Sequence, residues 1–410
     1  MGSHGISWGV VWTRIGAGPS KLAGMSTPPS FTYCAPTLIW SASDGLERLA
    51  SYLKRLHVER ALLVCDPWSE AHGVAAKVIA ASSGRIAHTF ALVESDAPRA
   101  SVQAGAEAAR AATADAVVSV GGGSAVDSGK AIALLALHGG DIGRWEGANK
   151  IGAPGLPHVA IPTTAGTGSE VSNIAVIKDP DAARKLVLID RALYPQVAIL
   201  DPRLTTSLPP ALTAATGIDA LTHAIEGMVS NFHQPACDAI GLECVRLLRR
   251  WLPRAVDDGQ NLEARGYCQI AAAMAGQLVS LTFSGIAHAV AHGLGIGFGV
   301  HHGTANAIAL AWSIRVNARS PSAAAAYGRV AEAWGISRAP EDTETPLALA
   351  DAIEAEVSRL GLPTRLSSVG VGATELRRLA VLAFADPSHQ PNPTPIRSAA
   401  ELEALLGSLV

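Results

Sequence analysis

Several histidines in the second half of the chain have spacings that suit metal binding. His288 and His292 stand four residues apart, as do Asp219 and His223, and residues four apart lie on one face of a helix. His302 follows in a glycine-flanked turn. A lone histidine on an apolar helix is usually a core residue. Several imidazoles and a carboxylate on apolar segments are costly to bury unless something pairs them, and a divalent ion such as Fe²⁺ or Zn²⁺ does so. The pattern therefore predicts a metal site.

Two glycine-rich segments in the first half each follow an apolar run. The first reads GGGSAVDSGK over residues 121–130, and the second reads PTTAGTGSE over residues 162–170. Glycines let a backbone approach an anion closely, and a helix N-terminus offers it unpaired N–H groups. The first segment is neither GxGxxG nor a P-loop, and a glycine turn needed only for packing is the alternative. Two such loops in one domain favour a bound dinucleotide.

Asp66 stands at the end of the apolar run 61–65. An acidic residue at a strand end can accept hydrogen bonds from the adenosine ribose of a dinucleotide. By position alone, a capping or solvated aspartate is the stronger interpretation. The absence of Arg and Lys between Cys65 and Gly73 indicates NAD(H) in preference to NADP(H), because nothing there offsets a 2′-phosphate.

The elements that must position these residues fall into two domains. Short apolar runs at 61–65, 114–120, 157–161 and 197–200 alternate with alanine-rich helical stretches such as 99–113. This alternation predicts a doubly wound α/β domain over 31–208, with parallel strands buried on both faces. From 209 to 410 the pattern predicts helices, at 211–229, 235–251, 262–281, 285–294, 305–318, 322–334 and 346–360. The predicted class is α/β plus all-α, and residues 1–30 are interpreted as an N-terminal extension.

Composition narrows the function classes. The chain has 410 residues, of which 49% are hydrophobic and 16% charged, with a formal net charge of −3. No basic block supports nucleic-acid binding, and no apolar run reaches transmembrane length. Five cysteines without CxxC spacing argue against a disulfide framework and fit a reducing compartment. We expect a cytoplasmic protein with no membrane or nucleic-acid partner.

The order of these motifs resembles the iron-containing (group III) alcohol dehydrogenases. GGGSxxDxxK, PTTxGTGSE, GxDALTHAIE, HxxxH and an HG turn follow one another, and the similarity runs from about Phe31 to the C-terminus, including Asn392 and Pro393. The resemblance implies a dehydroquinate synthase-like architecture. In it, a cleft between the dinucleotide-binding domain and the helical domain holds the metal and the nicotinamide.

The resemblance also implies site residues. The metal ligands fall on Asp219, His223, His288 and His302, where family spacing selects His302 over His301, a position at which relatives commonly carry proline. His292 matches the non-ligand histidine beside the substrate and is the candidate catalytic residue. The implied cofactor-binding residues are Asp66, Gly122, Gly123, Ser124, Asp127, Thr163, Thr164, Thr167, Asn173 and Lys185.

These assignments imply a metal-dependent oxidoreductase, with Fe²⁺ the first choice and Zn²⁺ the second. It would transfer a hydride between NAD and an alcohol, aldehyde or ketone, and the resemblance implies a homodimer. Reductases similar to maleylacetate reductase or glycerol dehydrogenase are the nearest alternatives. Maleylacetate reductases typically lack the aspartate found here at Asp127 and the usual metal set. A protein of another class, which binds nucleotide or metal without catalysis, would bind the cofactor without turnover.

Overall fold

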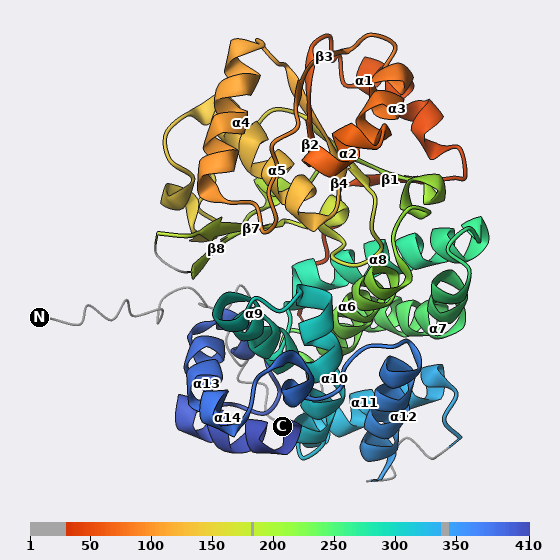
Figure 1. The fold of residues 1–410 in the computed structure, drawn as a ribbon, viewed down its shortest axis with the longest axis vertical. Coiled ribbons are helices and arrows are strands. Elements are labelled where there is room, and N and C mark those ends of the chain that lie inside the picture. Colours follow the sequence, from red (N-terminus) through yellow and green to blue (C-terminus); the bar gives the residue numbers. More distant parts are fainter. Residues whose placement is uncertain (1–29, 182–183, 338–343) are drawn as a thin grey trace, which may run out of the picture.

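The computed structural model describes residues 30–181, 184–337 and 344–410. Figure 1 shows two halves, an α/β half above and a helical half below. The predicted fold class, a doubly wound α/β domain followed by an all-α domain, is confirmed. The predicted extension, residues 1–30, lies outside the described residues except for Ser30.

A six-stranded parallel sheet forms the centre of the α/β half. In order across the sheet, its strands are β1 (Leu38–Ser41), β9 (Val197–Leu200), β6 (His158–Pro162), β4 (Ala116–Gly121), β2 (Ala61–Cys65) and β3 (Ile86–Phe90). Strands β2, β4, β6 and β9 correspond to the four apolar runs of the sequence. Every residue of these four strands is buried, as expected of strands that are covered on both faces.

Helices cover both faces of the sheet (Figure 1). In β2, Leu62 and Val64 pack into the cluster that includes α4 and α5, whereas Leu63 and Cys65 pack with α1 and α3. This division follows from the alternation of side chains along a strand. The helices of this half are α1 (Leu49–Arg55), α2 (Pro67–Ala71), α3 (Val74–Ala81), α4 (Arg99–Ala111) and α5 (Gly123–His138).

A second, three-stranded sheet lies at the lower edge of the α/β half, on the side of the helical half (Figure 1). Its strands β7 (Ile174–Asp179) and β8 (Arg184–Ile189) pair antiparallel, and β5 (Gly147–Ala148) pairs parallel to β8. The sequence pattern did not predict this sheet. It carries Lys185 toward the region between the halves.

The helical half begins at Pro210, one residue after a second proline, and proline suits the first turn of a helix. Its helices are α6 (Pro210–Val229), α7 (Pro235–Asp257), α8 (Leu262–Thr282), α9 (Ile286–Phe298), α10 (His302–Asn317), α11 (Pro321–Trp334), α12 (Thr345–Arg359), α13 (Leu376–Ala385) and α14 (Ala399–Leu406). All seven predicted helices are present, and α13 and α14 were not predicted. The domain boundary at 208/209 stays a prediction.

The prediction that His302 lies in a turn is wrong. Gly299 ends α9 with a positive φ of 68°, His301 then takes the N-cap position, and His302 is the first residue of α10. Of the glycines on either side of this pair, Gly299 belongs to the end of α9 and Gly303 to α10 itself. The backbone of His302 is therefore helical.

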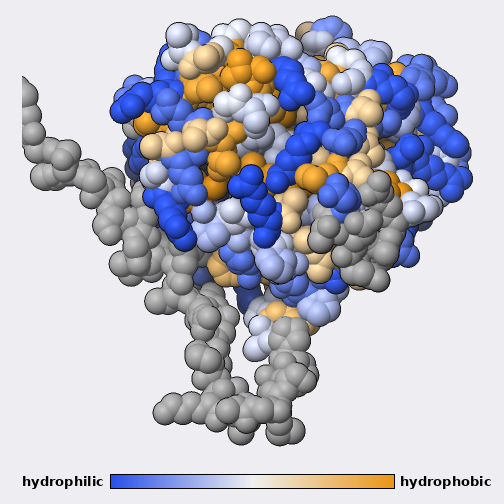
Figure 2. Space-filling model, turned by 90° about the horizontal axis from the view of Figure 1, so that it is seen from below, coloured by the Kyte–Doolittle hydropathy of each residue, from blue (hydrophilic) through white to orange (hydrophobic). Residues whose placement is uncertain are grey.

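No single helix in the described parts of the chain combines the length and hydropathy needed to cross a membrane, although α8 and α9 pass that test as a pair bent by 102°. On the face that Figure 2 shows, which is the underside of the view in Figure 1, apolar residues form small patches among hydrophilic ones.

Candidate active site between the two halves

A pocket of about 710 Å³ lies between the halves. The α/β half lines it with both glycine-rich loops and the β7–β8 hairpin. The helical half lines it with residues of α6, α8, α9 and α10 and with the segment that follows α13. The elements that carry the two groups of motifs in the sequence therefore meet at one cavity.

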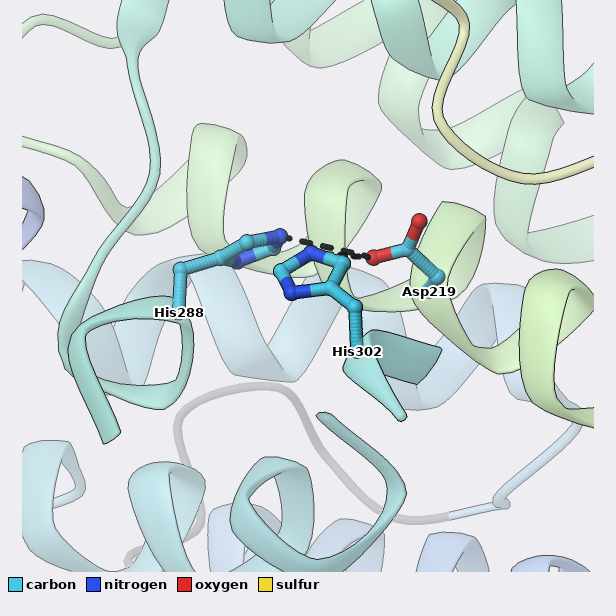
Figure 3. Close-up of side chains that lie close together, drawn as sticks. All are labelled: Asp219, His288 and His302. Atoms are coloured by element: carbon cyan, nitrogen blue, oxygen red, sulfur yellow. Dashed lines mark ion pairs between the residues drawn. The ribbon is translucent and has the colours of Figure 1, made fainter. Parts of the chain in front are cut away.

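Three of the predicted metal ligands converge in this pocket (Figure 3). Asp219 comes from α6, His288 from α9 and His302 from α10, and one ligand atom from each lies within 4.8 Å of the others. The Oδ1 atom of Asp219 lies 3.6 Å from Nε2 of His288 and 3.3 Å from Nε2 of His302. Asp219 and His288 are both 2% exposed. Two imidazoles and a carboxylate converging in this way form a ligand set for a transition-metal ion.

His223, the fourth predicted ligand, lies beside this cluster but outside the set of converging atoms. It stands one turn after Asp219 on α6, and its ring stacks on that of His288 with centroids 4.4 Å apart. Its Nδ1 atom is buried and has no hydrogen-bond partner in the part of the chain that the structure describes. A buried polar atom without a partner costs free energy, so the site favours a ligand here.

The protonation of the metal-free cluster follows from burial and mutual charge. Burial lowers the pKa of His223 to about 3 and that of His302 to about 4. Burial also lowers the pKa of His288, but hydrogen bonds to Asp219 and Glu226 outweigh burial and raise it to about 9. Burial raises the pKa of Asp219, yet the charges of His223 and His302 hold it well below the usual range. An ionised carboxylate beside the neutral imidazoles of His223 and His302 favours a cation among them, and in the metal-free cluster the protonated imidazole of His288 is that cation.

Glu226 holds His288, and sequence reasoning missed it. The Oε2 atom of Glu226 lies 2.6 Å from Nδ1 of His288 and accepts the N–H of Gly285 at 2.8 Å, and Oε1 accepts the N–H of Ala287 at 2.6 Å. The carboxylate is buried, with 2% of the residue exposed. Its presence on an apolar helix three residues after His223, a predicted ligand, was the available signal.

Asn306 holds Asp219 and was also missed. It stands one turn after His302 on α10, and its Nδ2 atom donates to Oδ1 of Asp219 at 2.7 Å. Asn306 is completely buried. This bond fixes the orientation of the Asp219 carboxylate from α10, the helix that also carries His302, and residues behind metal ligands commonly act in this way.

His292, the predicted catalytic residue, lines the same pocket one turn after His288. Its ring stacks on that of His302 with centroids 5.2 Å apart. Its Nδ1 atom lies 2.8 Å from Oδ2 of Asp386, which sits between α13 and the short 3₁₀ helix Pro387–His389. Burial raises the pKa of Asp386, but the charge of His292 and the hydrogen bond with it lower that pKa to about 2. Nothing in the sequence around Asp386 indicates this pairing.

Most of the predicted cofactor-binding residues line the pocket. Those that do are Gly122, Gly123, Ser124, Asp127, Thr164, Thr167 and Lys185, and those that do not are Asp66, Thr163 and Asn173. His301, the alternative to His302 as a metal ligand, is exposed and lines the pocket, but it is not among the three converging ligands.

The two glycine-rich loops touch each other. Gly122 is the N-cap of α5, and a Cβ atom on Gly123 would lie 2.7 Å from Cγ2 of Thr167, so only glycine lets the loops approach this closely. Asp127 stabilises this contact, because it accepts the hydroxyl of Ser169 and, at 3.0 Å, the N–H of Val176. Its carboxylate thus joins α5 to the second loop and to the hairpin.

Thr163 and Asn173 do not line the pocket, although their chain neighbours Thr164, Ser172 and Ile174 do. The N–H of Thr163 donates to the carbonyl of Gly121 at 2.9 Å, which ties the second loop to the first. The carbonyl of Asn173 accepts the N–H of Asp190 at 3.0 Å, and its buried Oδ1 atom has no partner in the described chain. Both residues are placed to support the loops whose other residues reach the cavity.

Asp66 follows the last residue of β2 and is the N-cap of α2. Its carboxylate accepts the N–H of Ser69 at 2.8 Å and the hydroxyl of Ser69 at 2.9 Å. Its Oδ2 atom lies 3.1 Å from the position that a Cβ atom on Gly121 would occupy. The capping role that position alone indicated is thus present, and it places the carboxylate beside the start of the first glycine loop.

Asp96 is a further pocket residue that sequence reasoning missed. It pairs with Lys185, whose Nζ atom lies 3.2 Å from its Oδ1 atom, and its N–H donates to Oγ of Ser124 at 3.0 Å. Its φ of +63° is unusual for a residue other than glycine. The strained backbone brings this carboxylate to the hairpin and the first glycine loop at once.

Comparison with known proteins assigns this architecture to a family. The model of the iron-containing alcohol dehydrogenases matches residues 36–202, and the model of the C-terminal domain of the Fe-containing alcohol dehydrogenases matches residues 213–410. Alcohol dehydrogenase 4 of Saccharomyces cerevisiae is 36% identical over 361 residues, which cover 87% of this chain and 93% of that protein. The NAD-dependent methanol dehydrogenase of Bacillus methanolicus is 33% identical over 85% of this chain and 92% of that protein.

A solved structure supports the same family assignment. Sulfoacetaldehyde reductase from Bifidobacterium kashiwanohense, in complex with NAD⁺, is 30% identical with a TM-score of 0.84 over 93% of this chain and 99% of that one. The predicted cofactors, a nicotinamide dinucleotide and iron, are confirmed at the level of the family. With its two matched domains and a converging ligand set in the cleft between them, the chain belongs to the iron-containing alcohol dehydrogenases.

Proposed function

We propose that the protein transfers a hydride between NAD(H) and short primary alcohols or the matching aldehydes in the pocket between the two halves. Fe²⁺ would be held by Asp219, His223, His288 and His302. His292 would take up and return the hydroxyl proton. Two of the relatives named above act, by their names, on methanol and on sulfoacetaldehyde, a primary alcohol and an aldehyde.

The observation that carries the proposal is the convergence of Asp219, His288 and His302 in a cavity that the two glycine-rich loops also line. The donor set fits iron or zinc, and the unpartnered Nδ1 of the adjacent His223 supports a fourth ligand. When bound, the divalent ion lowers the pKa of an alcohol hydroxyl or polarises a carbonyl, and the nicotinamide accepts or delivers the hydride.

The role of His292 follows from the environments of its two ring nitrogens. Asp386 occupies Nδ1, so Nε2 remains to exchange a proton with the substrate hydroxyl. The side chain is 14% exposed, and the residue lines the pocket, so a proton can pass from it to water. Histidine suits this task because its pKa lies near neutrality when it is unperturbed.

The substrate end of the pocket is mainly apolar. Val279, Phe283, Ala291 and Val300 line it near the histidines. Phe283 packs edge to face on Phe232, with ring centroids 5.6 Å apart. An apolar wall beside the reacting centre suits the carbon chain of an alcohol or aldehyde.

The experiment measures turnover and metal content together. The purified protein, with its metal quantified by mass spectrometry, is assayed for NADH oxidation with aldehydes of graded chain length, with a ketone and with maleylacetate. We expect metal-dependent turnover of short aldehydes. NAD binding in a calorimeter without turnover of any carbonyl compound would indicate a non-catalytic binding protein, and turnover of maleylacetate alone would indicate a reductase of that type.

We also infer a homodimer. Strand β1 is an edge strand, and four large apolar residues on it or just before it are between 36% and 49% exposed: Phe31, Tyr33, Leu38 and Ile39. An exposed apolar edge of this kind favours pairing with another chain. Light scattering at micromolar concentration tests the assembly, with Ile39→Lys expected to shift it toward monomer and a monomeric wild type contradicting it.

The five cysteines support a reducing compartment, and hence the cytoplasm, because all of them are free and four of them are buried. Fractionation of cells that express the tagged chain, compared with a cytoplasmic marker, tests this placement. Recovery with a secreted fraction would contradict it.

A further inference from the structure

Two histidines of α9 are held at the same ring nitrogen by carboxylates from different parts of the helical half. Nδ1 of His288 lies 2.6 Å from Oε2 of Glu226 on α6, and Nδ1 of His292 lies 2.8 Å from Oδ2 of Asp386 after α13. We propose that Glu226 and Asp386 are positioning residues, which direct Nε2 of one histidine to the metal and Nε2 of the other to the substrate. This inference rests on the proposed function.

For Glu226, the direction of the hydrogen bond follows from the other bonds of the carboxylate. Oε1 accepts the N–H of Ala287, and Oε2 accepts the N–H of Gly285, so both oxygens already act as acceptors. The bond to His288 is therefore one in which Nδ1–H donates. A neutral imidazole that carries its proton on Nδ1 presents a lone pair at Nε2, and Nε2 is the atom that lies 3.6 Å from Asp219.

The same carboxylate also fixes the position of the helix. The N–H groups that Glu226 accepts belong to the residues before and after Ile286, the first residue of α9. The first N–H groups of a helix have no partner within it, so a carboxylate there is favourable. Glu226 thus fixes the start of α9 and the ring of His288 in one arrangement.

For Asp386, the second oxygen is likewise occupied. Oδ1 accepts the N–H of Ser388 at 2.9 Å, which leaves Oδ2 to accept Nδ1–H of His292. Pro387 and Ser388 both line the pocket. The side chain that orients the proton-exchanging ring is therefore next to residues of the pocket wall, and the two carboxylates hold neighbouring histidines that serve two different functions.

The test asks whether substitution of Glu226 affects mainly metal affinity and substitution of Asp386 affects mainly kcat. In Glu226→Gln, an NH₂ group replaces one of the two acceptor oxygens. It then faces either the N–H of Ala287, which weakens the fixed start of α9, or the N–H of Gly285 together with Nδ1 of His288, which removes the acceptor of Nδ1. Either arrangement holds His288 less firmly. We expect the apparent affinity for Fe²⁺ and Zn²⁺, measured by competition with a chelator, to fall by about 10- to 100-fold. If Glu226→Gln is insoluble, Glu226→Asp gives the same comparison, because it keeps the charge and shortens the reach.

In Asp386→Asn, the amide can keep its bond to Ser388 only by turning its NH₂ toward Nδ1 of His292. That arrangement moves the imidazole proton to Nε2, where the substrate proton must be received. We expect wild-type metal affinity and KM, with kcat lower by about 100-fold or more. Asp386→Glu restores a carboxylate and should recover part of kcat, a rescue that a purely structural role would not produce.

Asp201→Asn is the matched control. Asp201 caps the 3₁₀ helix Pro202–Thr205, as Asp386 caps Pro387–His389, and its carboxylate pairs with Arg203 at 2.6 Å, but it does not line the pocket. We expect this variant to lose stability without changing metal affinity or kcat.

Two results would overturn the inference. One is wild-type metal affinity in the Glu226 variants together with wild-type kcat in Asp386→Asn. The other is a parallel loss of metal, rate and thermal midpoint in all three charge-removing variants, which would show only structural damage. Failure of the proposed function is distinct: full metal binding in His288→Ala or full rate in His292→Ala would remove the roles of the histidines themselves.

Discussion

The rings of His292 and His302 stack with their centroids 5.2 Å apart and their planes inclined by 21°. A residue proposed to exchange a proton thus lies directly against a residue proposed to hold the metal. One substrate oxygen can therefore be close to both, which is the geometry that alcohol oxidation requires. Because the rings touch, rate measurements alone do not separate the two roles, and metal content has to be measured in every variant.

His288→Ala should lose both metal and turnover. It removes one of the three converging ligand atoms and leaves Glu226 buried without its imidazole partner. We expect less than stoichiometric metal after purification and no measurable NADH oxidation, with an unchanged circular dichroism spectrum as the control for folding. Wild-type metal stoichiometry in this variant would refute the ligand assignment.

His292→Ala should keep its metal and lose rate. The imidazole lines the pocket but is not one of the three converging ligands, so the metal site remains. Loss of a general acid–base group lowers kcat by about 100-fold or more. The measurement is steady-state kinetics with metal analysis of the same sample, and a metal-free His292→Ala protein would show that the residue is a ligand instead.

The sequence predicted the elements whose pattern is local. The fully buried strand β2 is a continuous apolar run, and the pairs Asp219–His223 and His288–His292 have helical spacing that brings each pair to one face. The meeting of α6, α9 and α10 at one point was implied by the family resemblance alone, because the crossing of helices depends on packing between residues far apart in the chain.

The residues that were missed are those whose partners are distant. Asp386 lies 94 positions from His292 and Glu226 lies 62 positions from His288, and neither pairing leaves a local pattern. The β7–β8 hairpin was missed for a different reason. Its strands alternate buried and partly exposed residues beside a buried parallel sheet, and the sequence was interpreted by looking for continuous apolar runs.

Stability of the metal-free protein should decrease in acid, in part because of His158 on β6. This residue is 3% exposed, bonds through Nε2 to Oγ of Ser119 at 2.8 Å, and lies away from the metal cluster. Burial, with a smaller contribution from the charge of Lys130, lowers its pKa to about 3 in the folded state. In the unfolded chain, the His158 imidazole has a pKa of about 6.5, so in mild acid it binds a proton that it does not bind in the folded state.

The contribution of the neutral His158 to the free energy of unfolding is complete above about pH 6.5. It is lost as the pH falls toward about 3, at up to about 1.4 kcal/mol per pH unit for one proton. His158→Gln keeps a partner for Ser119 and removes the titration. The difference in thermal midpoint between wild type and variant, measured from pH 7 to pH 4, should therefore shift in favour of the variant in acid, and a pH-independent difference would contradict the assignment.

Replacing Asp66 should relax the preference for NAD(H) over NADP(H). Its carboxylate stands at the carboxyl end of β2, the edge at which open α/β sheets bind ligands, beside the first glycine loop. Ser69 uses one acceptor position on each oxygen, and a carboxylate has about four such positions, so two remain for the ribose hydroxyls. Charge-assisted bonds of this kind contribute about 1.5–3 kcal/mol.

A 2′-phosphate removes one of those donors and places negative charge against the carboxylate, and both effects favour NAD(H) by about tenfold or more. Asp66→Gly removes the charge together with the cap of α2, whereas Asp66→Ser removes the charge and keeps a capping hydroxyl. If the Asp66 carboxylate discriminates between a free 2′-hydroxyl and a 2′-phosphate, both variants raise kcat/KM for NADPH relative to NADH. Asp66→Ser does so with a smaller loss of thermal midpoint. An unchanged cofactor ratio in both variants would show that Asp66 only caps the helix.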